Sequence, residues 1–201
     1  MQEALYIPQA AGTGEFRDRG SRFLAYAWPV TRFEEIDPYQ ARLRKEFFDA
    51  RHHCYAYRLG MKGETTFASD DGEPSHSAGT PILSAIRAEN LTQVLVIVVR
   101  YFGGTKLGVR GLIDAYRTAA TEALHGIPRI LVVPRVLIRL EYPYTQTADL
   151  QRIMHRVDAA QISAEYTDRC VQTLAINEAD FPALRDRLDQ ARIVWHHPNQ
   201  D

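Results

Sequence analysis

Apolar residues in the first 134 positions recur with two different periods, which predict both strands and helices. Continuous or alternating apolar runs predict strands over residues 21–30, 52–59 and 91–102. The last of these is apolar without interruption from 94 to 99, which predicts a strand buried on both faces. Apolar residues three and four positions apart predict helices over residues 38–48, 81–89 and 112–124. In the first helix, the side expected to face inward carries Tyr39, Leu43, Phe47 and Phe48.

A second series of elements begins after Pro134. The pattern predicts strands over residues 135–142, 160–166, 170–176 and 191–196, with a hairpin turn at 167–169. Helices are expected over 147–157, with Thr147 as its N-cap, and over 179–188. The resulting order β-α-β-β-α-β is typical of a ferredoxin-like domain. The sequence therefore predicts an α+β protein of two domains, residues 1–134 and 135–201.

Composition excludes several classes of protein. The 24 Lys and Arg residues are balanced by 25 Asp and Glu residues, so a protein that coats polyanions over its whole surface is excluded. The only cysteines, Cys54 and Cys170, form no disulfide framework and no CxxC metal motif, which fits a reducing, cytoplasmic location. The first residues lack the pattern of a secretory signal, and the longest apolar run is too short to cross a bilayer. We therefore expect no membrane association.

An acidic loop over residues 69–81 is the first candidate for chemistry. Its carboxylates are Asp70, Asp71 and Glu73. Three carboxylates suit a hard cation such as Mg²⁺, and Ser75 beside His76 suggests a nucleophile and its base. The simpler interpretation is that Asp and Gly form turns here and that Ser77 caps the next helix. We expect no catalytic Ser-His pair, since adjacent side chains on an extended loop point apart. We also expect no metal ion and no cofactor, because short motif matches without structural context are mostly false.

A glycine-rich basic loop, residues 98–111, is the stronger candidate. It ends a buried strand and begins a helix, where unpaired backbone N–H groups and the helix dipole favour an anion. The residues expected to bind phosphate or RNA are Arg100, Gly103, Gly104, Lys106, Gly108, Arg110 and Gly111. The spacing is neither that of a P-loop nor GxGxxG. The alternative is that these glycines only permit a tight turn and close helix packing.

Both loops resemble the paired signatures of the IMPACT/YigZ family. The matching segments are SDDGEPSHSAGTPIL and VVRYFGGTKLGVRGLIDAY, together with SRF at 21–23 and RHHCYAY at 51–57. The resemblance covers about residues 20–130, and the segment after Pro134 resembles the ferredoxin-like domain of bacterial members, which is similar to the last domain of elongation factor G. His76 and Arg110 stand where the family more often has glycine, and Asp114 where it often has a basic residue.

The resemblance implies a role in translation. It implies a first domain like domain IV of elongation factor G and the second domain of a small-subunit ribosomal protein. Eukaryotic relatives regulate translation by competing for an activator of an amino-acid-starvation kinase, so a protein partner in translation control is possible. We expect a non-enzymatic regulator that binds ribosomes or structured RNA, with Arg100 and Lys106 against phosphates.

The acidic loop needs its own explanation. We expect Asp70, Asp71 and Glu73 to organise the loop beside the glycine turn by pairing with Arg100, or to form a second site with His76. Two alternatives stay open. One is an enzyme for an anionic or phosphorylated small molecule with Asp70 or Glu73 as general base, and the other is a protein-binding module.

Overall fold

The computed structural model describes residues 4–198 and divides between Val132 and Val133 into two compact units. The strands of the N-terminal unit are β1 (Tyr6–Pro8), β2 (Gly12–Asp18), β3 (Ser21–Pro29), β4 (His52–Leu59), β5 (Thr65–Ser69), β6 (Val94–Tyr101) and β7 (Arg129–Leu131). Its helices are the short 3-10 helix η1 (Phe33–Glu35), α1 (Ile36–Glu46), α2 (Gly79–Ala88) and α3 (Gly108–Leu124). An antiparallel sheet has the order β2-β3-β6-β4-β5, and β1 pairs with β7.

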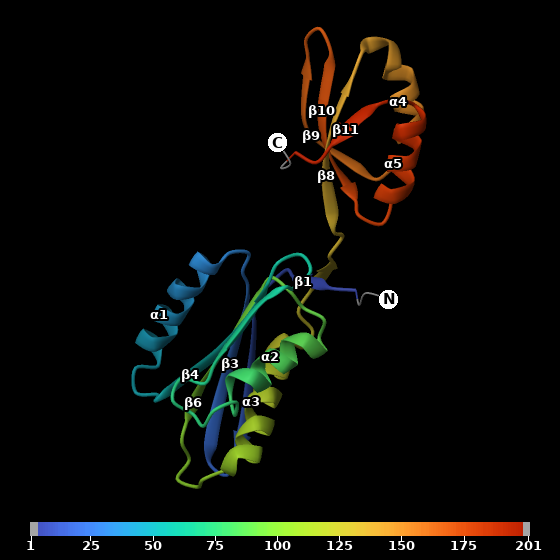
Figure 1. The fold of residues 1–201 in the computed structure, drawn as a ribbon. Helices are drawn as coiled ribbons and strands as arrows, with labels where there is room; N and C mark the ends of the chain where they lie inside the picture. Colours follow the sequence, from blue (N-terminus) through green and yellow to red (C-terminus); the bar gives the residue numbers. More distant parts are fainter. Residues whose placement is uncertain (1–3, 199–201) are drawn as a thin grey trace. The chain divides into compact units, whose positions relative to one another are not determined.

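The central strand β6 is buried on both faces, as its sequence predicts. Val94, Val96 and Val98 enter the core beneath α2 and α3. Leu95, Ile97 and Val99 enter the second core, which includes residues of α1. Figure 1 shows α1 on one face of the sheet and the other two helices on the opposite face. The period-2 alternation of a strand therefore divides one apolar run between two cores.

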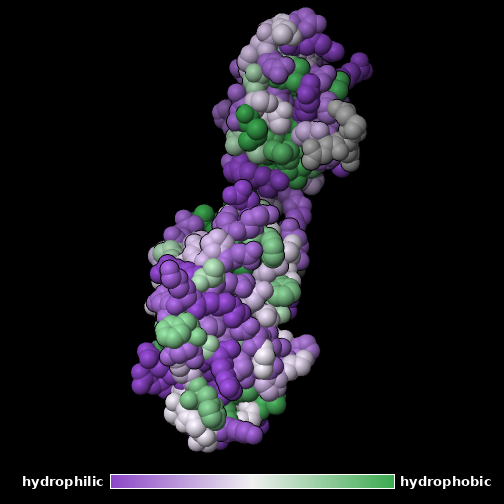
Figure 2. All heavy atoms as spheres, turned by 90° about the vertical axis from the view of Figure 1, so that its left-hand side faces the viewer, coloured by the Kyte–Doolittle hydropathy of each residue, from purple (hydrophilic) through white to green (hydrophobic). Residues whose placement is uncertain are grey.

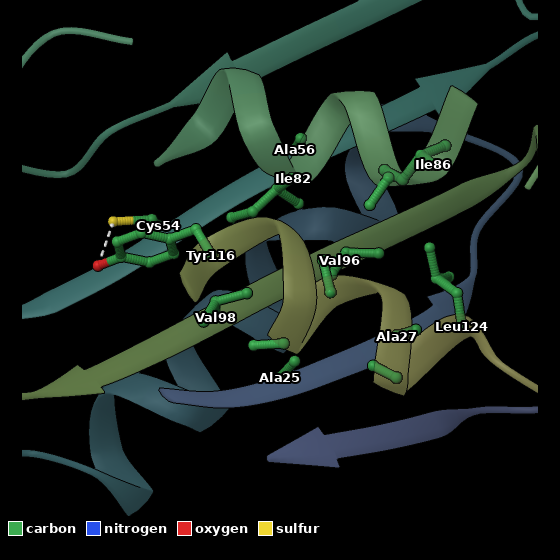
Figure 3. Packing of buried hydrophobic residues seen from close by; sticks show 14 of the residues in the cluster. Ala25, Ala27, Cys54, Ala56, Ile82, Ile86, Val96, Val98, Tyr116 and Leu124 are labelled. Atoms are coloured by element: carbon green, nitrogen blue, oxygen red, sulfur yellow. Dashed lines mark hydrogen bonds between the residues drawn. The ribbon is translucent and has the colours of Figure 1, made fainter. Parts of the chain in front are cut away.

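Small residues allow α2 and α3 to approach the sheet closely. In Figure 3, alanines of β3 and β4 face Ile82 and Ile86 of α2 and Leu124 of α3. Gly12 and Gly14 of β2 serve the same purpose, because a Cβ atom on either would lie within 2.5 Å of the α3 backbone at Ala123. Strand glycines often mark such close backbone approach.

The predicted inward face of α1 needs one correction. Leu43 is buried, and Tyr39 and Phe47 pack against the same core. Phe48 lies beyond the end of the helix and is 83% exposed, because the chain turns away at Phe47. In Figure 2, the face of the N-terminal unit that carries α1 is largely hydrophilic, with apolar residues scattered over it.

The C-terminal unit has the predicted β-α-β-β-α-β order. Its elements are β8 (Arg135–Tyr142), a 3-10 helix η2 (Tyr144–Gln146), α4 (Thr147–Met154), β9 (Ala159–Tyr166), β10 (Cys170–Asn177), α5 (Phe181–Gln190) and β11 (Val194–His196). The antiparallel sheet has the order β11-β8-β10-β9. Both helices lie on one face of it, over a core that includes Leu150 and Leu184 (Figure 1). The prediction that Thr147 caps α4 is wrong: η2 leads directly into the helix, whose N-cap is Gln146.

Candidate functional site

A groove of about 670 Å³ in the N-terminal unit brings parts of both signature motifs together. The acidic loop contributes Glu73 and Pro74. The end of β6 and the start of α3 contribute Arg100, Tyr101, Phe102, Lys106, Leu107, Gly108, Val109 and Leu112. The remaining wall is formed by residues 49–52, which connect α1 to β4 and include the first residue of β4. Segments about 50 positions apart in the sequence therefore form one concave surface.

The acidic loop begins with a tight turn. Asp71 and Gly72 have φ values of 40° and 86°, and the N–H of Glu73 donates to the carbonyl oxygen of Asp70 over 2.9 Å. Two successive residues with positive φ inside an i to i+3 hydrogen bond are typical of a type I′ turn. The turn sends the side chains of Asp70, Asp71 and Glu73 to different partners.

Asp70 caps helix α2 from a distance in the sequence. Its carboxylate accepts hydrogen bonds from the backbone N–H groups of His76, Ala78 and Gly79, over 2.8–2.9 Å. The expectation that Ser77 caps this helix is wrong, because its hydroxyl donates instead to the carbonyl oxygen of Pro74. Since both carboxylate oxygens of Asp70 accept backbone hydrogen bonds, this residue is not placed as a general base in the groove.

Asp71 joins the acidic loop to β4 and α1. Its carboxylate accepts the backbone N–H of His53 over 2.6 Å and a hydrogen bond from Arg44 over 2.9 Å. Burial alone would raise the pKa of Asp71, but these hydrogen bonds and the charge of Arg44 lower that pKa overall. The carbonyl oxygen of Asp71 lies 2.9 Å from Nδ1 of His52, whose ring lines the groove. Because a carbonyl oxygen can only accept, this contact is a hydrogen bond when Nδ1 of His52 carries a proton.

Glu73 forms a buried ion pair with Arg100. Its Oε1 accepts from Nη1 of Arg100 over 2.6 Å and from the hydroxyl of Tyr116 over 2.8 Å. The side chains of Glu73 and Arg100 are only 4% and 8% exposed. The Tyr116 hydroxyl lies 3.3 Å from the thiol of Cys54 (Figure 3), and burial raises the pKa of both groups. A polar chain thus runs from the groove into the core, and Glu73 is the link expected between the acidic loop and Arg100.

The glycines of the basic loop have separate structural roles. A Cβ atom on Gly103 would lie 1.9 Å from the backbone of Gly20, in the turn between β2 and β3. Gly104 and Gly108 have φ values of 88° and 74°, a conformation that glycine adopts without steric cost. Gly111 is less constrained, since its Cβ would meet only the Leu107 side chain, at 3.0 Å.

The cations around the loop differ in how freely a ligand can reach them. Arg100 was expected to be available with Lys106, but it is buried and its charge is offset by Glu73. Lys106, Arg110 and Arg51 are exposed and have no carboxylate within ion-pair distance among the described residues. Helix α3 begins at Gly108, with no side-chain cap and no acidic residue in its first turn. Gly108, Arg110 and Gly111 thus belong to the first turn of α3 rather than to a loop.

His76 lies apart from the groove. It has a φ of 61°, its N–H donates to Asp70, and its ring contacts Thr80 rather than Ser75. The left-handed backbone gives a physical reason why glycine suits this position. Among residues 4–198, no group of three or more His, Cys, Asp or Glu side chains is placed to hold a metal ion. Within the same range, no helix is long and apolar enough to cross a membrane.

Sequence reasoning did not assign to the site several polar and aromatic residues that line the groove, among them Asp49, Arg51, His52, Tyr101 and Phe102. The Tyr101 hydroxyl donates to Asp49 over 2.7 Å, and this hydrogen bond is the main reason why the pKa of Tyr101 is raised to about 12. The available signal was their position in the sequence. Arg51 and His52 lie at the start of the strand β4, and Tyr101 and Phe102 lie at the end of the strand β6. Strand ends are common positions for binding residues.

The family profile described as the Impact N-terminal domain matches residues 19–124, more than half of the chain. The chain belongs to the IMPACT family. It is 31% identical to an IMPACT family member from Haemophilus influenzae, over 92% of this chain and 90% of that protein. It is 30% identical to the IMPACT family member YigZ from Escherichia coli, over 92% of each chain. The resemblance drawn from the motifs is confirmed, and it extends over most of the chain.

A solved structure is similar in fold to this IMPACT family member. The crystal structure of a protein described as hypothetical matches all of both chains, with a TM-score of 0.68 and 26% identity. The likeness includes both units. It supports the α+β architecture with separate sheets.

Proposed function

We propose that this IMPACT family member binds structured RNA, the ribosome's RNA included, through backbone phosphates at the start of α3. The observation that carries the proposal is the group of Lys106, Arg110 and Arg51, which are exposed and lack carboxylate partners among the described residues. They lie around the uncapped N-terminus of α3 and the groove beside it. The amide groups of such a helix end, together with nearby cations, favour phosphate.

A second observation that supports the proposal concerns Arg100, which lines the same groove and is more than nine-tenths buried. Its Nη1 donates to Glu73, whereas its Nε is buried with no hydrogen-bond partner. This nitrogen lies beneath the surface, and the guanidinium is held by Glu73 and by the rings of Phe23 and Phe102 rather than presented to a ligand. We assign Arg100 a positioning role, in which it holds the groove in shape beside the exposed cations.

Translation is the setting that the family resemblance favours. The expected likeness of the N-terminal domain to domain IV of elongation factor G, and of the C-terminal domain to the last domain of that factor, supports the ribosome as the source of the RNA. Fold analogy alone is a weak reason for a function. The arrangement of cations at α3 is the independent physical reason.

Co-sedimentation with purified ribosomes tests the proposal. We expect the wild-type protein to pellet with ribosomes at low salt and Lys106→Glu to remain largely in the supernatant. Lys45→Glu is the matched control, because Lys45 is also exposed but lies in the last turn of α1. Equal pelleting of all three proteins, or no pelleting of the wild type, would contradict the proposal.

A further inference from the structure

Phe102 is an exposed aromatic side chain at the proposed RNA-binding groove. It directly follows β6, lines the groove and is 59% exposed. Val109, also exposed, lies along the same groove from the first turn of α3. An aromatic ring beside basic side chains is the combination on which proteins stack unpaired bases.

The surroundings of Phe102 hold it in a defined place. The guanidinium of Arg100 lies 5.7 Å from the centroid of the Phe102 ring and 5.5 Å from that of Phe23. Arg100 is itself fixed by its buried ion pair with Glu73. A cation at this distance attracts the electron-rich face of a ring. The Phe102 ring is therefore supported from within the protein while more than half of its surface stays open to a ligand.

The groove offers different chemistry to the two ends of a nucleotide. Apolar side chains, Phe102 and Leu107 among them, suit a base, while Lys106 and Arg51 suit the phosphates on either side of it. His52 also lines the groove, and its imidazole is a group that can hydrogen-bond to the polar edge of a base. A volume of about 670 Å³ lies within the range of small-molecule sites.

We propose that the groove receives a single unpaired nucleotide of a folded RNA, with its base stacked on Phe102 and its neighbouring phosphates held by Lys106 and Arg51. This inference rests on the proposed RNA-binding function and names the feature of the RNA that is read. Bases inside a duplex have no free face for stacking, so the site selects bulges and loops over continuous helices.

Fluorescence anisotropy with three RNA hairpins tests the inference on the full chain. One hairpin carries a single-adenosine bulge, the second carries an abasic residue at the bulge, and the third has no bulge. We expect the adenosine bulge to bind about tenfold more tightly than either of the others, the effect of one stacked base. Phe102→Ala is expected to remove that tenfold preference, and Phe102→Trp to keep it. Phe48→Ala is the control, because Phe48 is an exposed aromatic outside the groove.

The outcomes separate this inference from the proposed function. Salt-sensitive binding of all three hairpins with equal affinity would overturn the stacking site and leave the RNA-binding function standing. An unchanged preference in Phe102→Ala would also overturn the stacking site. No binding of any hairpin, together with no pelleting with ribosomes, would overturn both.

Discussion

Oε1 of Glu73 lies 2.6 Å from Nη1 of Arg100, and together these two side chains join the acidic loop to the end of β6. Glu73 belongs to one signature motif and Arg100 to the other, and 26 residues separate them in the sequence. The pair also fixes the floor of the groove, since both side chains line it. A buried ion pair of this kind fixes the relative position of the two segments more reliably than it adds net stability, because the cost of desolvating the charges offsets their attraction.

Removing one member of this pair is expected to be costly. Glu73→Gln leaves the Arg100 charge buried without its carboxylate, so we expect a loss of about 3–5 kcal/mol in the free energy of unfolding. Chemical denaturation in a Trp195→Phe background measures this, because Trp28 is then the only tryptophan and reports on the N-terminal unit. The double variant Glu73→Gln/Arg100→Met should lose less than the sum of the single variants. Additive losses would show that the two residues are not coupled.

The capping role of Asp70 predicts a second stability effect. Asp70→Ala leaves three backbone N–H groups without an acceptor, two of them on the buried residues Ala78 and Gly79. We expect a loss of about 2 kcal/mol or more in the free energy of unfolding, measured in the same background. Ser75→Ala is the control within the same loop, because Ser75 is exposed. A loss no larger than that of the control would show that the cap is unimportant.

His53 predicts a pH dependence of stability. Its ring is buried, and burial, followed by the charge of Arg44, lowers its pKa below the ordinary value of 6.5, although the charge of Asp71 and a contact with the Leu43 backbone act in the opposite direction. Below pH of about 6.5 the unfolded chain therefore binds more protons at this residue than the folded chain does, and stability falls as pH falls. The lowered pKa of Asp71 has its effect only below its unfolded value of about 3.9, outside this window.

Denaturation at pH 7.5 and pH 5.5 checks this prediction. We expect the wild-type N-terminal unit to lose stability between these two conditions and His53→Leu to lose clearly less. The Leu43 carbonyl near the His53 ring also accepts the backbone N–H of Phe47, so the leucine does not leave this carbonyl without a hydrogen bond. An equal loss in both proteins would assign the pH dependence to other groups.

The sequence pattern predicted elements with strong apolar periodicity and missed those without it. The uninterrupted apolar run of β6 predicted a strand buried on both faces, which is confirmed. β2 was missed because it is polar and contains Gly12 and Gly14, residues that weaken strand propensity but are required for contact with α3. β5 was missed within the polar stretch from 60 to 79 because none of its five residues is buried, so it carries no apolar signal of a core strand.

The site was predictable only in part, because its contacts join distant segments. The motifs indicated Lys106 as a candidate for phosphate binding and Glu73 as a residue that organises the acidic loop. Both residues line one groove in the structure. No local pattern showed that Asp70 would cap a helix eight and nine residues further on. Nor did any local pattern show that Arg51 and His52 would face the start of α3. Such relationships depend on strand order, which the apolar pattern does not determine.

The dependence of ribosome affinity on salt concentration tests the central claim most directly. If Lys106 contacts a phosphate, the logarithm of the wild-type association constant should fall linearly with the logarithm of salt concentration, because counterions are released on binding. Lys106→Gln should bind more weakly and reduce the slope by about one, while Lys45→Gln should follow the wild-type line. The same slope for all three proteins, or a wild-type affinity independent of salt, would contradict phosphate recognition at the start of α3.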